Sequence, residues 1–311
     1  MYKKIKLDDK IFIAGANGMA GQAIKRNLIK SGYKNLFSPL RKELDLFNIE
    51  DVKKWFFRNK PDVVIIAAAK VGGILANSSQ PTQFLLDNLK IQNNLIETAW
   101  KSEVKRLLFL GSSCIYPKFA SQPIKEEELL KGSLEKTNQW YAIAKIAGIK
   151  LCEALREQYD FDAISLMPTN LYGPGDNYHP NDSHVMASLI RKFYTAKKES
   201  LPVVNCWGTG SAYREFLHAY DLGEAVVFAL EEWDPKSDNA PLNEEGKPLT
   251  TLNVGTGIDI SIKELVNLIS SEVKYKGQIT WDKSKPDGTP KKLLNVERIN
   301  SLGWQAKISL K

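Results

Sequence analysis

The chain has 311 residues, of which 43% are hydrophobic and 25% are charged, and its formal net charge is +7. These values indicate a globular protein of one large or two joined domains and exclude wholesale disorder. No apolar run approaches the ~20 residues of a membrane helix, and no basic run is long enough to indicate nucleic-acid binding. We therefore expect no membrane and no nucleic-acid partner, and the positive charge could instead serve dinucleotides or nucleotide sugars.

The N-terminal segment is basic but lacks the apolar stretch of a secretory signal, because Asp8 and Asp9 interrupt it. The cytoplasm is therefore the expected location. The cysteines Cys114, Cys152 and Cys206 are widely spaced, and three scattered histidines accompany them. This set contains no CxxC pair, so we expect neither a disulfide framework nor a bound metal ion.

Strand-length apolar runs alternate with amphipathic helical stretches over the first part of the chain, a pattern typical of a parallel sheet covered by helices. In chain order, strands are expected at 10–14, 35–38, 62–67, 106–110 and 163–167. Helices are expected at 19–30, 49–59, 81–100 and 138–159. The predicted fold class is α/β, with residues 1–170 forming a Rossmann-type doubly wound parallel sheet that binds a cofactor.

The composition changes after Pro168, because glycine, proline, asparagine and aspartate cluster between 170 and 183 and predict long loops. Beyond these loops we expect a helix after Asp182, a strand near 203–204, helices at 221–230 and 261–271, and a strand near 279–280. Residues 171–311 should therefore form mainly a smaller α/β substrate-binding lobe. A segment near 209–230 is the exception, since we expect it to pack back onto the first domain.

A glycine-rich turn lies between the first predicted strand and the first predicted helix. It has the pattern GxxGxxG and reads Gly15-Ala16-Asn17-Gly18-Met19-Ala20-Gly21. Glycines let the backbone turn tightly and approach a pyrophosphate, and the helix N-terminus offers unpaired N–H groups. At this junction the motif predicts a dinucleotide site, with a tight turn that binds nothing as the alternative.

The second predicted strand ends without the Asp or Glu that usually accepts a hydrogen bond from the ribose of NAD. Its end reads Phe37-Ser38-Pro39-Leu40-Arg41, and the planar guanidinium of Arg41 can pair with a 2′-phosphate. NADP is therefore the favoured cofactor, unless Arg41 is only a surface charge. Asp45 and Leu46 follow at a point where a loop could cover the adenine.

Tyr141 and Lys145 lie four residues apart in the predicted helix 138–159, so their side chains share one face. A lysine ammonium favours the phenolate, and we expect Lys145 to lower the pKa of Tyr141. Ser112 follows the predicted strand 106–110, at the sheet edge where open α/β sheets bind ligands. Its hydroxyl could hydrogen-bond a ketone oxygen together with Tyr141. Together and in this order, the glycine turn, the strand-end serine and the Tyr-xxx-Lys pair indicate such a site far more specifically than any one of them does alone.

In these motifs the chain resembles the extended short-chain dehydrogenase/reductase family. Longer blocks narrow the resemblance to members that act on GDP-4-keto-6-deoxy-D-mannose, and these blocks are residues 67–74, 111–118, 141–150, 167–174 and 285–290. Those enzymes epimerise C3 and C5 of the sugar and reduce its 4-ketone with NADPH, which yields GDP-L-fucose. The resemblance therefore implies NADP as the cofactor, this nucleotide sugar as the substrate, and a homodimer that pairs through the helices at 81–100 and 138–159.

The resemblance also implies roles for individual residues. Ser112, Tyr141 and Lys145 match the reductase triad, while Cys114 and His184 match the base and the acid of the epimerisation. Besides the glycine turn and Arg41, the cofactor-binding positions are Asp45, Leu46, Ala67, Ala68, Leu110, Gly111, Ser112, Ser113, Tyr141, Lys145, Pro168, Thr169, Asn170, Leu171 and His184. The substrate-binding positions are Lys192, Trp207, Arg214 and Asp287.

The chain departs from the family pattern at several points. Lys192 stands where arginine is common, which keeps the charge for a diphosphate but loses the bidentate fork. Asn17 replaces a basic residue of some members, and the sequence stops at Lys311 where relatives continue into a terminal helix. The alternatives are another NAD(P)-dependent nucleotide-sugar epimerase or reductase of the same family, or a non-catalytic NADP-binding scaffold.

Structural roles compete with these functional interpretations. A single strand-end cysteine is more often a core residue than a catalytic one, so Cys114 acquires its role mainly through the resemblance. Cys152 and Cys206 are interpreted as packing residues. His218 is interpreted as structural and His179 as a loop residue.

Overall fold

The larger sheet of the computed structural model, which describes residues 3–180 and 182–310, has six parallel strands in the order β2-β1-β3-β4-β5-β9. They are β1 (Ile11–Ala14), β2 (Leu36–Phe37), β3 (Val63–Ile66), β4 (Arg106–Leu110), β5 (Ala163–Pro168) and β9 (Thr251–Val254). The strand order reverses between β1 and β3, which is the switch point at which doubly wound sheets bind their ligands. The predicted fold class is confirmed.

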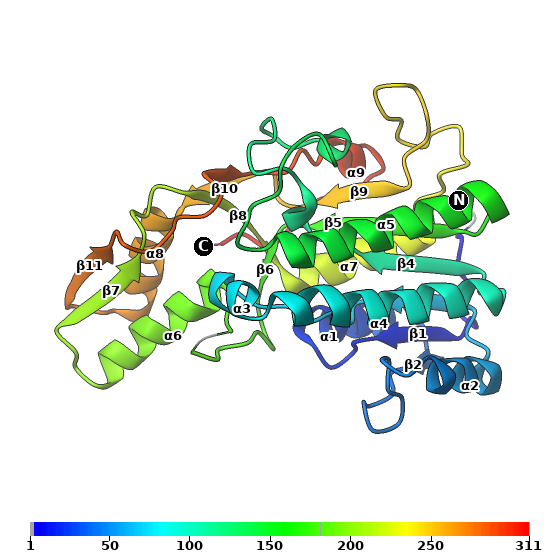
Figure 1. Ribbon diagram of the computed structural model, residues 1–311, viewed down its shortest axis with the longest axis horizontal. Coiled ribbons are helices and arrows are strands. Elements are labelled where there is room, and N and C mark those ends of the chain that lie inside the picture. The colour runs from blue at the N-terminus through cyan, green and yellow to red at the C-terminus, as the bar shows by residue number, and fades with distance from the viewer. Residues whose placement is uncertain (1–2, 181, 311) are drawn as a thin grey trace.

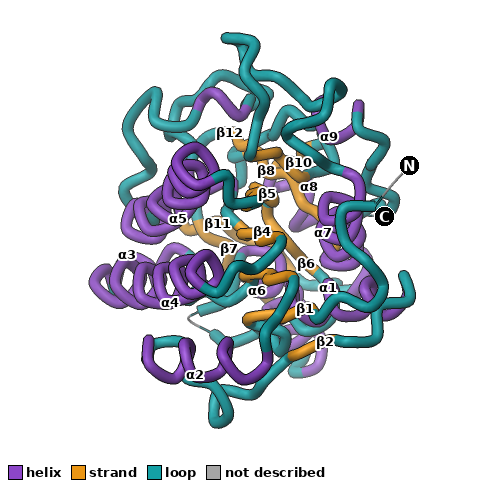
Figure 2. Tube along the Cα trace, turned by 90° about the vertical axis from the view of Figure 1, so that its right-hand side faces the viewer, coloured by secondary structure: helices purple, strands orange, loops and turns teal. Residues whose placement is uncertain are grey.

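Helices cover both faces of this sheet (Figure 2). One face carries α2 (Ile49–Asn59), α4 (Pro81–Lys101) and α5 (Gln139–Tyr159), and the other carries α1 (Met19–Lys30) and α7 (Ala219–Glu232). The α2 helix begins where Asn48 accepts hydrogen bonds from the first-turn N–H groups. A Cβ at Gly223 of α7 would lie 2.4 Å from the carbonyl oxygen of Ala23, so this glycine allows α7 to pack tightly on α1.

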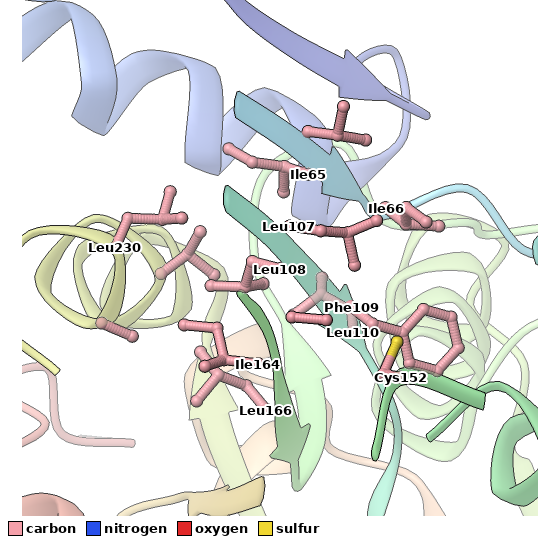
Figure 3. Close-up of a cluster of buried hydrophobic side chains, with 14 of the residues drawn as sticks. Ile65, Ile66, Leu107, Leu108, Phe109, Leu110, Cys152, Ile164, Leu166 and Leu230 are labelled. Atoms are coloured by element: carbon pink, nitrogen blue, oxygen red, sulfur yellow. The ribbon is translucent and has the colours of Figure 1, made fainter. Parts of the chain in front are cut away.

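The core of the sheet is built from strands that are buried on both faces. On β4, Phe109 points toward Cys152 of α5, whereas Leu108 points toward Leu230 of α7 (Figure 3). All four side chains are almost fully buried. Cys152 therefore has the packing role expected from the sequence.

A second lobe lies at one end of the molecule (Figure 1). Its four-stranded sheet comprises β6 (Asn170–Tyr172), β8 (Tyr213–His218), β10 (Asp259–Ser261) and β12 (Lys291–Lys292). Beside this sheet lie the parallel pair β7 (Val203–Trp207) and β11 (Gln278–Asp282), and the helices α6 (Val185–Lys198) and α8 (Ile262–Val273). A separate hydrophobic cluster fills the lobe and includes Phe193, Phe216, Leu265 and Cys206, which also packs as expected.

Several short elements are absent from the sequence prediction. They are α3 (Ile74–Ser79), the 3₁₀ turns η1 (Ser113–Ile115) and η2 (Glu126–Glu128), α9 (Glu297–Ser301), and the strands β6, β8, β9, β10 and β12. The interpretation of 170–183 as loops is wrong at its start, because Asn170–Tyr172 pairs in parallel with β8. Partners distant in sequence create such strands, and local composition does not reveal them. Within the described residues, no helix is both long and apolar enough to span a bilayer.

Candidate active site

A cavity of about 1070 Å³ lies between the carboxyl ends of the parallel strands and the second lobe. Every residue that the sequence assigned to cofactor, catalysis or substrate lines this cavity, from Gly15 in the first turn to Asp287 before β12. The glycine turn and Arg41 lie toward one end, Ser112, Tyr141 and Lys145 follow β4 and α5, and the substrate positions belong to the second lobe. The fold therefore brings the predicted residues together, while their individual roles stay predictions.

The turn between β1 and α1 has the shape of a phosphate cradle. Gly15 has a φ of +84°, in the left-handed region that favours glycine, and a Cβ there would lie 2.6 Å from the backbone nitrogen of Ala68. A Cβ at Gly21 would lie 2.1 Å from the carbonyl oxygen of Gly15. Gly18 begins α1 without a side-chain cap, and the first turn of α1 contains no acidic residue. Backbone N–H groups and the helix dipole are therefore available to a pyrophosphate, which fits a dinucleotide cofactor.

The adenosine end of this cradle carries positive charge. Arg41 is exposed, and its guanidinium lies 5.4 Å from the centroid of the Phe47 ring. The residue after β2 is Ser38, whose hydroxyl accepts a 2.8 Å hydrogen bond from Nζ of Lys25. A cation thus stands where NAD sites usually have a carboxylate, and this chemistry fits a 2′-phosphate. Lys25 does not itself line the cavity, and its proximity to Ser38 could not be predicted from the sequence, because it depends on the packing of α1 beside β2.

The predicted triad meets where β4 ends. Nζ of Lys145, which is 3% exposed, donates a 2.8 Å hydrogen bond to the carbonyl oxygen of Leu110. The same ammonium lies 5.9 Å from the centroid of the Tyr141 ring. The side chain of Ser112 hydrogen-bonds Tyr141. A serine and a tyrosine hydroxyl therefore face the cavity together, as recognition of a ketone oxygen requires.

The expectation that Lys145 lowers the pKa of Tyr141 is wrong for this structure. Burial raises the pKa of Tyr141, negative charge on Cys114 raises it further, and the hydrogen bond with Ser112 only partly opposes them. Burial also lowers the pKa of Lys145 to about 7, so its own charge is partly lost near neutral pH. Tyr141 therefore holds its proton, which suits a group that must donate one.

The low pKa of Lys145 predicts a pH-dependent gain in stability when this residue is replaced. An unfolded lysine titrates near ~10.4, so the unfolded chain holds the proton between about pH 7 and 10 while the folded protein does not. The penalty of the buried ammonium is therefore complete below pH ~7 and declines as the pH rises. Lys145→Met should raise the melting temperature more at pH 6 than at pH 9, by calorimetry without added nucleotide. An equal gain at both pH values would contradict the shift.

The two predicted epimerisation residues line the same cavity and come from different lobes. Cys114 lies in η1, which begins three residues after the end of β4, and its backbone N–H donates to Oγ of Ser112 over 3.2 Å. His184 is the N-cap of α6, as the expected helix start implied. Desolvation and the positive charge of Lys292 lower the pKa of this imidazole. The imidazole is therefore less often protonated at neutral pH, but its protonated form is a stronger acid.

Lys292 is the residue that sequence reasoning missed in the centre of the site. Its Nζ lies 3.4 Å from Sγ of Cys114, with hydrogen-bond geometry, and the residue is only 8% exposed. It belongs to β12, a strand of two residues. The surrounding segment is rich in lysine, a composition typical of a solvent-exposed surface. The one available signal was its position two residues after the 285–290 block.

The substrate end combines cations with an aromatic ring. Nζ of Lys192 lies 5.6 Å from the centroid of Trp207, which is 46% exposed, and Nζ of Lys285 lies 5.5 Å from that centroid. Desolvation lowers the pKa values of Lys192 and Arg214, so a bound anion would stabilise their charged forms. Such a cluster can hold a diphosphate.

Asp287 lines the cavity, but its carboxylate is already occupied. Its two oxygens accept hydrogen bonds of 2.8 Å from the backbone N–H and the hydroxyl of Thr209. Its carbonyl oxygen accepts a 3.1 Å bond from Arg214. These contacts indicate that Asp287 positions Arg214 and the turn after Trp207.

His218 and His179 have no part in this constellation as the structure describes it. Nδ1 of His218 accepts from the N–H of Tyr220 and caps α7, and its ring packs edge-on against Tyr172. This structural role agrees with the interpretation from the sequence. His179 lies in the loop before α6 and pairs with Asp182.

Comparison with known proteins places this site among enzymes of nucleotide-sugar metabolism. The family model described as "NAD dependent epimerase/dehydratase family" matches residues 11–243. The chain is 51% identical to GDP-L-fucose synthase 1 of Arabidopsis thaliana, over 97% of this chain and 90% of that protein. It is 49% identical to GDP-L-fucose synthase of Escherichia coli (strain K12), over 97% and 92%. Among solved structures, a GDP-mannoheptose C4 reductase of Campylobacter jejuni with NADP bound has a TM-score of 0.85 and 36% identity, over 98% and 96%.

Proposed function

The chain belongs to the NAD dependent epimerase/dehydratase family, and from this premise we propose that it is an NADP-dependent enzyme that converts GDP-4-keto-6-deoxy-D-mannose to GDP-L-fucose. The observation that carries the proposal is that a thiol and imidazole pair lines the same cavity as the Ser112, Tyr141 and Lys145 group. Residues 1–170, with the 209–230 segment, would serve mainly the cofactor, and residues 171–311 mainly the sugar nucleotide.

Epimerisation comes first in this proposal. The 4-ketone acidifies the hydrogens on C3 and C5, because the electrons left by either proton delocalise onto the ketone oxygen as an enolate. Cys114 removes the proton as a thiolate and becomes a thiol. His184, as imidazolium, returns a proton to the opposite face, which inverts the carbon centre. The serine and tyrosine hydroxyls hydrogen-bond the enolate oxygen.

Reduction uses the other group of residues. The glycine turn and Arg41 would hold NADPH, with Arg41 serving its 2′-phosphate, and the bound cofactor would supply the hydride. Tyr141 gives its proton to the oxygen that becomes the 4-hydroxyl, and Ser112 hydrogen-bonds this oxygen as its charge grows. Lys145, fixed on the Leu110 carbonyl, lies close enough to stabilise the phenolate that remains. Lys192 and Arg214 would hold the diphosphate.

Incubation of the protein with NADPH and GDP-4-keto-6-deoxy-D-mannose tests this proposal. We expect NADPH oxidation and a product with the NMR couplings of GDP-L-fucose. A product that is reduced but not inverted would favour a reductase such as the Campylobacter jejuni relative. Binding of NADPH without any oxidation would favour the non-catalytic scaffold.

Arg41 should determine the choice between NADPH and NADH. A charge-assisted hydrogen bond contributes about 1.5–3 kcal/mol, so Arg41→Ala should weaken NADPH binding about 10- to 100-fold and leave NADH binding nearly unchanged. Fluorescence titration of both nucleotides measures the effect. Lys42→Ala is the matched control, because Lys42 is an exposed cation next to Arg41 that does not line the cavity. Equal losses for both nucleotides would remove Arg41 from the 2′-phosphate site.

We also propose that the enzyme is a homodimer that pairs through α4 and α5. These helices pack side by side, and Leu86, Trp140 and Ile143 on them are each more than a third exposed. Ile143→Glu should convert a dimer to a monomer in light-scattering measurements, because a charge would be buried in the interface. Ile29→Glu, on the exposed face of α1, is the control. A monomeric wild-type protein would refute the pairing.

A further inference from the structure

We propose that Lys292 is the cation that keeps Cys114 in its thiolate form, so that the base of the epimerisation is a Cys114–Lys292 pair. The inference rests on the proposed function for its role in catalysis. The pair itself rests on the 3.4 Å contact between Nζ of the buried Lys292 and Sγ of the half-buried Cys114.

The backbone around Lys292 is fixed on both sides. Lys292 pairs with Arg214 in the β12–β8 register. The next two backbone N–H groups donate to side-chain oxygens, that of Leu293 to Oε1 of Gln122 over 2.9 Å and that of Leu294 to Oε2 of the buried Glu215 over 3.0 Å. Glu215 is fully buried and also accepts from the N–H of Gly257, so it joins two loops to β8. The ammonium therefore reaches Cys114 from a rigid position.

The charges near Cys114 leave the thiolate as the natural partner of this ammonium. A buried cation is costly unless an anion or dipole compensates it. Across residues 3–180 and 182–310, Lys292 forms no ion pair with a carboxylate. Glu135 is the carboxylate that lines the same part of the cavity, and it is ion-paired with Lys118 at 2.8 Å.

The other titratable groups around Cys114 supply no competing negative charge. Arg214 adds a second cation. Tyr141 keeps its proton because its pKa is raised by burial, and the lowered pKa of His184 favours a neutral imidazole. Two cations, Lys292 and Arg214, thus lie near one thiol. Among these groups, only the ionised thiol can compensate the positive charge of Lys292, the nearer cation.

The other cysteines provide an internal comparison. Burial raises the pKa of Cys152 to about 12 and also raises the pKa of Cys206. Burial acts in the same direction on Cys114, but Lys292, together with Ser112 and Arg214, reverses the effect and lowers the pKa of this thiol. Cys206 also has an ammonium nearby, that of Lys192, whose charge lowers the pKa of this thiol without overcoming the effect of burial. The hydrogen-bond contact of Lys292 with Sγ, together with Arg214 and Ser112, is therefore what distinguishes the candidate base from an ordinary packing cysteine.

The chemical step balances without a further reactant. The thiolate takes the proton from carbon and the C–H electron pair becomes the enolate, while Lys292 takes no part in the proton transfer. As the thiolate becomes a thiol, Lys292 loses its nearest anion, and the enolate in the same cavity becomes the remaining negative charge. Lys292 is thus a positioning and charge-stabilising residue that acts through Cys114.

The test compares Lys292→Met with Lys291→Met. Lys291 is the exposed neighbour on the same strand and pairs with Asp259, so its replacement removes the same charge from the chain without touching Cys114. The first readout is the ultraviolet absorbance of the thiolate against pH, assigned to Cys114 by its loss in Cys114→Ser. We expect Lys292→Met to raise the titration midpoint by about one unit or more, Lys291→Met to leave it unchanged, and Lys292→Arg to restore part of the shift.

The second readout is solvent-deuterium exchange next to the ketone. In Lys292→Met it should fall about 10-fold or more near neutral pH and recover at higher pH, because about one unit of pKa corresponds to a tenfold change in thiolate. A wild-type midpoint at or above the ~8.5 of an ordinary thiol would overturn the inference without any variant. So would an unchanged midpoint in Lys292→Met. The titration needs no substrate, so a low wild-type midpoint in a protein that fails to turn over would refute the proposed function and leave the pair intact.

Discussion

Cys114→Ser is expected to abolish exchange of the sugar hydrogens with solvent while NADPH still binds. Loss of a positioned general base costs about 10²–10⁴-fold in rate, and a serine hydroxyl is too weak an acid to ionise beside Lys292. NMR of GDP-4-keto-6-deoxy-D-mannose in deuterated buffer measures the exchange, and fluorescence titration measures NADPH binding. Because Cys114 lies beyond Ser112 in the cavity, the cofactor cradle at Gly15–Gly21 should be unaffected.

Cys152→Ala is the matched control for this variant. Cys152 is buried more fully than the half-buried Cys114, but it packs on Phe109 within the core and does not line the cavity (Figure 3). Its replacement can lower stability, yet exchange per folded molecule should stay near the wild-type rate. Unchanged exchange in Cys114→Ser would remove Cys114 from the role of base.

Tyr141→Phe is expected to stop reduction and spare most of the exchange. The variant retains the ring but loses the proton that the 4-oxygen must receive, so NADPH oxidation should fall by about 10²–10⁴-fold. Exchange should persist, because Cys114 and His184 remain and Ser112 still offers a hydroxyl to the ketone oxygen. Stopped-flow measurement of NADPH oxidation and NMR of exchange in the same preparation separate the two steps.

Tyr159→Phe is the control for the tyrosine variant. Tyr159 ends the same α5 helix, is half exposed, and packs on Trp100 far along the helix from the catalytic tyrosine. Both steps should proceed at wild-type rates in this protein. If Tyr141→Phe lost exchange and reduction equally, the two steps would share the tyrosine as an essential group and could not be assigned to separate residues.

The sequence predicted the parts of the fold that are determined locally. The helices α1 and α2 begin and end where periodicity placed them, because Gly18 precedes one and the Asn48 cap precedes the other. By contrast, β6 and β12 are two or three residues long and exist because β8 lies beside them. Nothing within so short a stretch carries the information about such a partner.

The residues of the candidate site divide in the same way, into those that local sequence reveals and those that only the assembled fold brings together. Ser112, Tyr141 and Lys145 have a recognisable spacing, and the resemblance added Cys114 and His184. The sequence could not indicate that burial dominates the pKa of Tyr141, since burial depends on the whole cavity wall. It also could not reveal the contact of Lys292 with a thiol 178 positions earlier in the chain. Contacts of this kind arise only when both lobes are assembled.

The central claim is that one cavity carries out inversion and reduction on the same sugar. Its most direct test is the isotopic composition of the product that the wild-type protein forms in deuterated water with unlabelled NADPH. The account predicts GDP-L-fucose with solvent deuterium at C3 and C5, both centres inverted, and ordinary hydrogen from the nicotinamide at C4. A reduced product with no solvent label and uninverted centres would contradict it.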